Sequence, residues 1–248
     1  MKYMTKPSSV AAAVALAVAA MGAGLAHAQD AKPDHEVSYN AAVTTDYRYR
    51  GISQSRLKPA LQAGADYVNN PTGLYLGTWA SSIKWVKDGG GDTNLEWDIY
   101  GGKRGEIAPG VSYDVGGLYY FYPSNGLKPS ANTFELYGQI GYGPATLKYS
   151  SSTTNLFGFA DSKHSGYLDA QVNQEIAAGL VLNLHVGHQK VRHNSAASYT
   201  DYKIGVTKDF GVASVSLAVI KANSDAYVGA GGKDLAKTGA VLTVSKVF

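Results

Sequence analysis

The sequence contains no cysteine among its 248 residues. This absence excludes disulfide-built domains, cysteine-ligated zinc, iron–sulfur clusters and cysteine nucleophiles. Charge is also scarce, at 17% of residues, and no dense basic cluster is present to neutralise phosphates, so nucleic acid is not an expected partner. Beyond the N-terminal region the longest apolar run covers residues 177–182. A transmembrane helix needs about 18 or more such residues, so none is expected.

The first 28 residues have the pattern of a secretory leader. Two lysines precede an alanine-rich apolar stretch at 10–25, and a small-x-small cleavage site ends at Ala28. We predict cleavage between Ala28 and Gln29 after Sec-type export. The mature domain, residues 29–248, then has 20 basic and 19 acidic residues, a net charge of +1.

Apolar and polar side chains alternate with period two from residue 37 to residue 50. Val37, Tyr39 and Val43 share one face, whereas Ser38 and Asn40 share the other. This alternation is typical of a strand with one face in an apolar medium and one in water. The pattern predicts about twelve strands, because it recurs at 61–67, 75–83, 95–99, 111–121, 134–142, 145–149, 168–172, 182–186, 202–206, 215–219 and 240–248.

The connections between these strands are alternately short and long. Short segments rich in turn residues lie at 69–73, 104–110, 143–144, 175–179 and 209–211. Longer ones lie at 52–59, 84–94, 123–132, 152–165, 190–198 and 221–236. An all-β, transmembrane, up-and-down antiparallel barrel has this organisation, with short periplasmic turns and longer extracellular loops. A soluble β-sandwich has no reason to separate loop lengths so regularly.

Aromatic residues gather near the ends of the predicted strands, on the faces interpreted as apolar. We expect them to form girdles at the membrane interfaces, and the set is Tyr47, Tyr49, Tyr75, Trp79, Tyr119, Phe121 and Tyr142. The chain ends in Phe248, which shares a strand face with Leu242 and Val244. A terminal aromatic residue on an amphipathic strand resembles the signal read by the bacterial barrel-assembly machinery. The expected partners are therefore that machinery and outer-membrane lipid.

The segment at 46–55 reads DYRYRGISQS and is followed at 59–67 by PALQAGADY. These residues resemble the opening of the TorF-like porins, a proteobacterial outer-membrane family. Segments at 76–81, 94–101, 112–116 and 202–210 agree, so the resemblance spans the mature chain. It implies a porin-like barrel in the outer membrane of a Gram-negative bacterium, and it supplies no substrate or binding residues.

The polar strand faces would line the barrel lumen. An acidic wall is expected on the fourth to sixth strands, and first-strand arginines are expected to find partners at Asp46 and Asp66. Lysines on later strands lie beside Asp169 and Asp201. The lumen-lining candidates are Asp46, Arg48, Arg50, Asp66, Glu96, Asp98, Asp114, Glu135, Lys148, Asp169 and Lys203.

These charges leave two interpretations open. In the first, opposed walls of unlike charge surround an open pore for passive diffusion of ions or small hydrophilic solutes. In the second, the charges neutralise one another in a rigid, non-conducting barrel that has a structural or surface-binding role.

A lipid hydrolase is a third class, weighed on one group of residues. His188, His193, Ser195 and Ser198 precede Asp201, but they form no defining motif. We therefore predict no enzymatic activity, no cofactor and no metal site.

Overall fold

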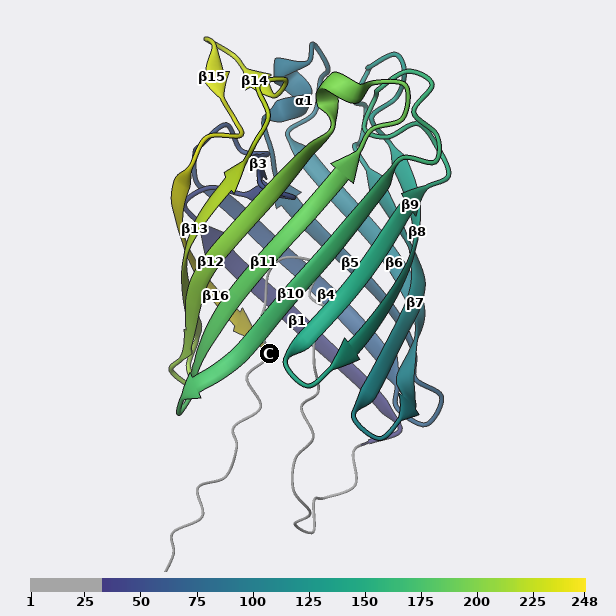
Figure 1. Cartoon of the computed structure of the whole chain (residues 1–248), viewed down its shortest axis with the longest axis vertical. Coiled ribbons are helices and arrows are strands. Elements are labelled where there is room, and N and C mark those ends of the chain that lie inside the picture. The colour runs from purple at the N-terminus through teal and green to yellow at the C-terminus, as the bar shows by residue number, and fades with distance from the viewer. Residues whose placement is uncertain (1–32) are drawn as a thin grey trace, which may run out of the picture.

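The computed structural model describes residues 33–248, and its twelve long strands close into one antiparallel barrel (Figure 1). The predicted leader and its cleavage site lie outside the described residues. Each strand pairs with its neighbours in the chain, and the last closes onto the first. The strands are β1 (His35–Thr44), β4 (Ala60–Asn69), β5 (Leu74–Ser82), β6 (Leu95–Ala108), β7 (Val111–Phe121), β8 (Thr133–Tyr142), β9 (Ala145–Ser152), β10 (Gly166–Ala177), β11 (Leu180–Lys190), β12 (Tyr199–Asp209), β13 (Ser214–Ala222) and β16 (Gly239–Val247).

Short turns gather at one end of the barrel and long connections at the other, as the loop lengths predict. The long connections carry the small elements β2 (Arg48–Tyr49), β3 (Ile52–Ser53), α1 (Trp85–Asp88), η1 (Ser195–Ala197), β14 (Val228–Gly229) and β15 (Lys233–Asp234). The prediction of a twelve-stranded up-and-down barrel is thus confirmed.

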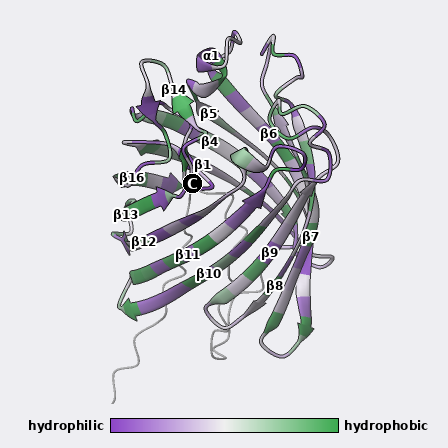
Figure 2. Ribbon diagram, turned by 45° about the horizontal axis from the view of Figure 1, so that its top comes forward, coloured by the Kyte–Doolittle hydropathy of each residue, from purple (hydrophilic) through white to green (hydrophobic). Residues whose placement is uncertain are grey.

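Burial is inverted relative to a water-soluble protein. Outward side chains such as Leu76, Ile140 and Ile204 are 54–58% exposed. In contrast, Glu96 and Glu135, which point into the barrel, are only 2% and 1% exposed. Figure 2 shows the resulting alternation of hydrophobic and hydrophilic residues along the strands. Such a surface is stable only against an apolar medium. Among residues 33–248 no helix has the length and apolarity to cross a bilayer.

The first strand is shorter than its sequence pattern predicts. It ends at Thr44, and residues 45–59, here called the inner segment, turn into the barrel and form the β2–β3 hairpin. Arg50 and Gly51 take positive φ values of 47° and 79° in that hairpin, and a side chain at Gly51 would collide with Asp201. The alternation of apolar and polar residues continues through this segment because the side chains of a hairpin also point alternately to its two faces.

Four of the predicted girdle residues therefore face the interior. Tyr47 and Tyr49 belong to the inner segment, and the prediction that they face lipid is wrong. Tyr75 and Trp79 are also inward, because Tyr75 is buried and bonds Asp114 while Trp79 packs edge-on against Tyr47. The sequence of β5 does not distinguish its two faces, because Leu74 and Leu76 make the outer face as apolar as the inner one.

Other aromatic residues do form exterior bands. Tyr119 and Phe121 stack on each other near the long-loop end, and Tyr142 is 71% exposed at the short-turn end. Further exposed rings on the outside are Tyr39, Tyr67, Trp97, Tyr149, Tyr202 and Phe210. The girdle expectation thus holds for Tyr119, Phe121 and Tyr142.

Tyrosine rings cover glycines on adjacent strands inside the barrel. Tyr75 lies directly opposite Gly102, and Tyr137 lies opposite Gly116. A Cβ at either glycine would collide with the facing ring. This pairing lets large rings lie flat along the wall and shields backbone that would otherwise be bare.

The seam where the first strand, β1, pairs with the last strand, β16, is short. Strands β1 and β16 pair only over residues 40–44 and 243–247, with further backbone hydrogen bonds between Tyr39 and Phe248. Across the same seam Thr44 and Thr243 join their hydroxyls at 2.9 Å.

Candidate lumen site

Arg50 reaches from the inner segment across the barrel interior. Its guanidinium donates to both carboxylate oxygens of Glu135 on β8, at 3.0 and 2.7 Å, and to Gln189 on β11 at 2.7 Å. It also lies over the rings of Tyr49 and Tyr167, at 4.8 and 4.2 Å from their centroids. Both partners of the ion pair are shielded from water, so the contact is strong.

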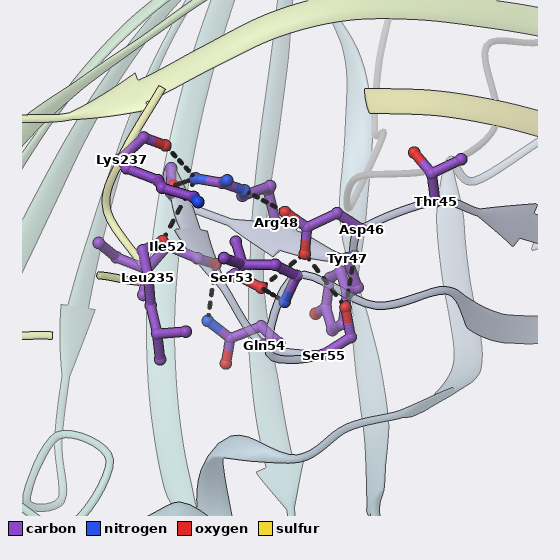
Figure 3. A network of polar contacts seen from close by, with 12 residues as sticks. Thr45, Asp46, Tyr47, Arg48, Ile52, Ser53, Gln54, Ser55, Leu235 and Lys237 are labelled. Carbon is purple, nitrogen blue, oxygen red and sulfur yellow. Dashed lines mark hydrogen bonds and ion pairs between the residues drawn. The ribbon is translucent and has the colours of Figure 1, made fainter. Parts of the chain in front are cut away.

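Two further arginines hold the inner segment to the long loops. Arg48 pairs with Asp46 at 2.6 Å and donates to the carbonyls of Leu235 and Lys237 in the last loop, as Figure 3 shows. The same Asp46 accepts hydroxyl donors from Ser53 and Ser55, at 2.5 and 3.2 Å.

Arg56 donates to Asp88 of α1 through Nε at 2.9 Å. The inner segment is therefore tied by its arginines to the last loop, to the far barrel wall and to the loop that contains α1.

Glu96, Asp98 and Glu135 form what we call the acidic chamber, together with the rings of Trp79 and Tyr120. Glu96 accepts hydrogen bonds from the hydroxyls of Tyr47 and Tyr122, at 2.7 and 3.3 Å. Burial and the charge of Glu96 raise the pKa of both tyrosines well above the usual range, so each remains a donor.

Asp98 differs from its two neighbours in the acidic chamber. It is fully buried, and neither carboxylate oxygen has a hydrogen-bond partner. In the strand register it lies between Trp79 on β5 and Tyr120 on β7.

A second charged cluster surrounds His185 on β11. The imidazole lies between two carboxylates, with Nδ1 2.9 Å from Asp169 and Nε2 2.7 Å from Asp201. Tyr167 donates to Asp201 at 2.8 Å and completes the cluster. Contacts on both ring nitrogens suit a doubly protonated imidazole.

The short-turn half of the lumen is more open. Tyr100 donates to Asp66 at 2.6 Å, and Tyr75 donates to Asp114 at the same distance. Lys148 lies over the Tyr137 ring at 3.9 Å, and Lys203 faces the interior beside the His185 cluster. Asp66, Arg104, Lys148 and Lys203 all remain partly exposed.

Several predicted partnerships differ from those observed. Arg48 and Arg50 belong to the inner segment and not to the first strand, and Asp66 pairs with Tyr100 and not with an arginine. The lumen-lining candidates predicted from sequence do not include His185, Tyr167 and Gln189. The signal was available, because His185 has the same strand parity as the inward Asn183 and Gly187.

The residues weighed for a hydrolase are not assembled into a triad. His188 contacts the Thr200 hydroxyl at 3.0 Å, and His193 contacts the carbonyl of Asp161 at 2.8 Å. Asp201 is engaged by Tyr167 and His185 on the inner side of the wall.

A family model described as "Bacterial protein of unknown function (Gcw_chp)" matches residues 28–248. The chain belongs to this family. The match covers the whole described barrel, and the finer likeness to the TorF-like porins stays a prediction. No curated protein matches the chain.

Solved outer-membrane barrels are among the similar structures. The Acinetobacter baumannii outer membrane protein Omp33 has 8% identity and a TM-score of 0.48, with 86% of this chain and 97% of that chain covered. A doubly substituted OccD1 (OprD) has 11% identity and a TM-score of 0.41, with 86% and 65% covered. A variant of the Rh. blastica porin has 12% identity and a TM-score of 0.38, and the match spans 75% of this chain and about half of the porin, 55%. Similarity at this level assigns no activity.

Proposed function

We propose that the protein is a porin-like channel of the bacterial outer membrane, through which ions or small hydrophilic solutes diffuse passively. The observation that carries the proposal is the water-exposed charge inside a barrel with an apolar exterior. Lys148 and Lys203 face the lumen and stay partly exposed. An ammonium group that forms no ion pair is costly in a dry interior, whereas a water-filled passage hydrates it.

The apolar exterior and the exterior aromatic bands support the location. In this orientation the long loops face outward and the short turns face the periplasm. Outer-membrane lipid would contact the apolar wall, and the barrel-assembly machinery would read the strand that ends in Phe248. Sequencing of the envelope form from its N-terminus should begin at Gln29 if the leader is cleaved as proposed.

Passage through the long-loop half requires movement of the inner segment. Tyr47 and the residues around it are buried there, and Arg50 joins the segment to the opposite wall. We infer that the inner segment is the constriction and that its position sets the size of the passage.

A second candidate function is favoured by the same ion pair. If Arg50 and Glu135 never separate, the barrel is a closed, rigid anchor for its long loops. Single-channel recording of refolded protein in planar bilayers distinguishes the two. Steady conductance supports the channel, whereas a folded wild type and a folded Arg50→Ala variant that both carry no current support the anchor.

A further inference from the structure

The acidic chamber contains a buried carboxyl group for which it supplies no partner. Of its three carboxyl groups, Glu135 is bound by the guanidinium of Arg50. Glu96 receives two tyrosine hydroxyls, but Asp98 receives no donor although it is fully buried. Asp98 also lies within electrostatic range of Glu96 and Glu135, so ionisation of Asp98 beside these two carboxylates costs free energy. A cation beside Asp98 would remove both costs.

The surroundings of Asp98 suit an organic cation. Trp79 and Tyr120 flank it in the register of neighbouring strands, and indole and phenol faces attract ammonium and guanidinium groups. Within residues 33–248 no group of three or more His, Asp or Glu side chains is arranged to hold a metal ion. Aromatic flanks with a single free carboxylate therefore favour an organic cation over a metal.

The chain itself already shows this mode of recognition. Arg50 is bound by a carboxylate at its edge and by the rings of Tyr49 and Tyr167. A carboxylate together with aromatic rings is thus a combination that holds a guanidinium group inside this barrel.

We propose that the acidic chamber binds a small organic cation with a guanidinium or ammonium group, and that Asp98 is its carboxylate partner. The proposal deepens the proposed function by naming a class of solute, and it rests on that function for the claim that the bound cation passes through. Entry requires the inner segment to shift, because Asp98 has no exposed surface.

The test measures binding of methylguanidinium to the refolded full-length barrel at constant ionic strength. Methylurea is the matched probe, since it has nearly the same shape and no charge. Trp79 is a reporter beside the site, so intrinsic tryptophan fluorescence gives the affinity, and the unfolding temperature gives a second readout. We expect methylguanidinium to change both in a saturable way and methylurea to change neither.

The decisive variant is Asp98→Asn, which breaks no hydrogen bond of the described structure. We expect it to fold and to bind methylguanidinium at least tenfold more weakly. Asp66→Asn is the control, because Asp66 is a lumen carboxylate bonded to Tyr100 and lies outside the chamber. It should bind like the wild type.

Two results would overturn the proposal. Equal binding by Asp98→Asn and the wild type would mean that Asp98 simply holds a proton, and equal effects of methylurea would mean that charge is not recognised. Conductance is recorded separately on the same preparations. Binding without current contradicts the channel and leaves the cation site intact, whereas current without binding contradicts the cation site alone.

Discussion

Arg50 and Glu135 form a two-point ion pair across the barrel, although they are 85 residues apart in the sequence. Arg50 belongs to the β2–β3 hairpin inside the barrel, and Glu135 belongs to β8 in the barrel wall. The pair therefore determines where the inner segment lies within the lumen.

Replacement of Arg50 by Ala should open the passage and weaken the barrel. Loss of one member of a buried ion pair leaves the other charge uncompensated, at a cost of about 3–5 kcal/mol. We expect a several-fold larger single-channel conductance together with a lower unfolding temperature. The double variant Arg50→Ala, Glu135→Gln should recover part of the lost stability and keep the larger conductance. Wild-type conductance in a folded Arg50→Ala protein would contradict the role of the inner segment as the constriction.

Ion selectivity should depend on the carboxylates of β6 and β7. Replacement of Glu96, Asp98 and Asp114 by the corresponding amides removes three negative charges at nearly constant volume. We expect a lower preference for cations, most clearly at 0.01 M salt, where the Debye length is about 30 Å. Reversal potentials in a salt gradient measure the change. Tyr113 and Val115, on the outward face of β7, are the control positions and should affect insertion rather than selectivity. A conducting protein whose reversal potential does not move would show that these carboxylates lie away from the ion path.

Phe248 should matter for assembly more than for the stability of the finished barrel. Its side chain is 67% exposed, and its backbone pairs with Tyr39 whatever the side chain. Burial of so little surface contributes at most about 1–2 kcal/mol. We expect Phe248→Ala to reduce the amount in the outer membrane while refolded protein keeps its heat-modifiable mobility on gels. Unchanged membrane levels would argue against an assembly signal.

A methyl group at Gly187 should disturb the His185 cluster. A Cβ there would collide with the Tyr167 hydroxyl and crowd Asp201. Overpacking of this kind costs about 1–3 kcal/mol. The comparison is Gly138→Ala, where the nearest atom to the new Cβ is a Val115 methyl at 4.0 Å. Thermal unfolding should separate the two variants, and equal unfolding temperatures would mean that Tyr167 moves aside freely.

The wall of the barrel could be predicted from sequence because lipid and lumen impose opposite preferences on alternate residues. The alternation of short and long connections then predicted that the short turns lie at one end of the barrel and the long loops at the other. The inner segment could not be predicted in the same way, because Tyr47 and Tyr49 continue the alternation after the chain has left the wall. The decisive signal is local, in the left-handed backbone at Arg50 and Gly51.

The interior was harder to predict for a second reason. A lumen filled by aromatic rings makes both faces of a strand apolar, as Tyr75 and Leu76 do on β5, and hydropathy no longer distinguishes them. Partnerships such as Arg50 with Glu135 depend on how the bore closes in three dimensions. Strand parity gives the side on which a charge lies, but not the residue that it meets.

The short β1–β16 seam bears on how the barrel is completed. The first strand can pair with the last only when nearly the whole chain has entered the membrane. Few backbone hydrogen bonds form in that final closure, so they stabilise it only weakly. Arg48, which follows the first strand, takes its carbonyl partners from the loop that precedes the last one. These hydrogen bonds form only when β1 and β16 have closed the barrel. An intermediate whose first and last strands are still unpaired would lack them and be less stable.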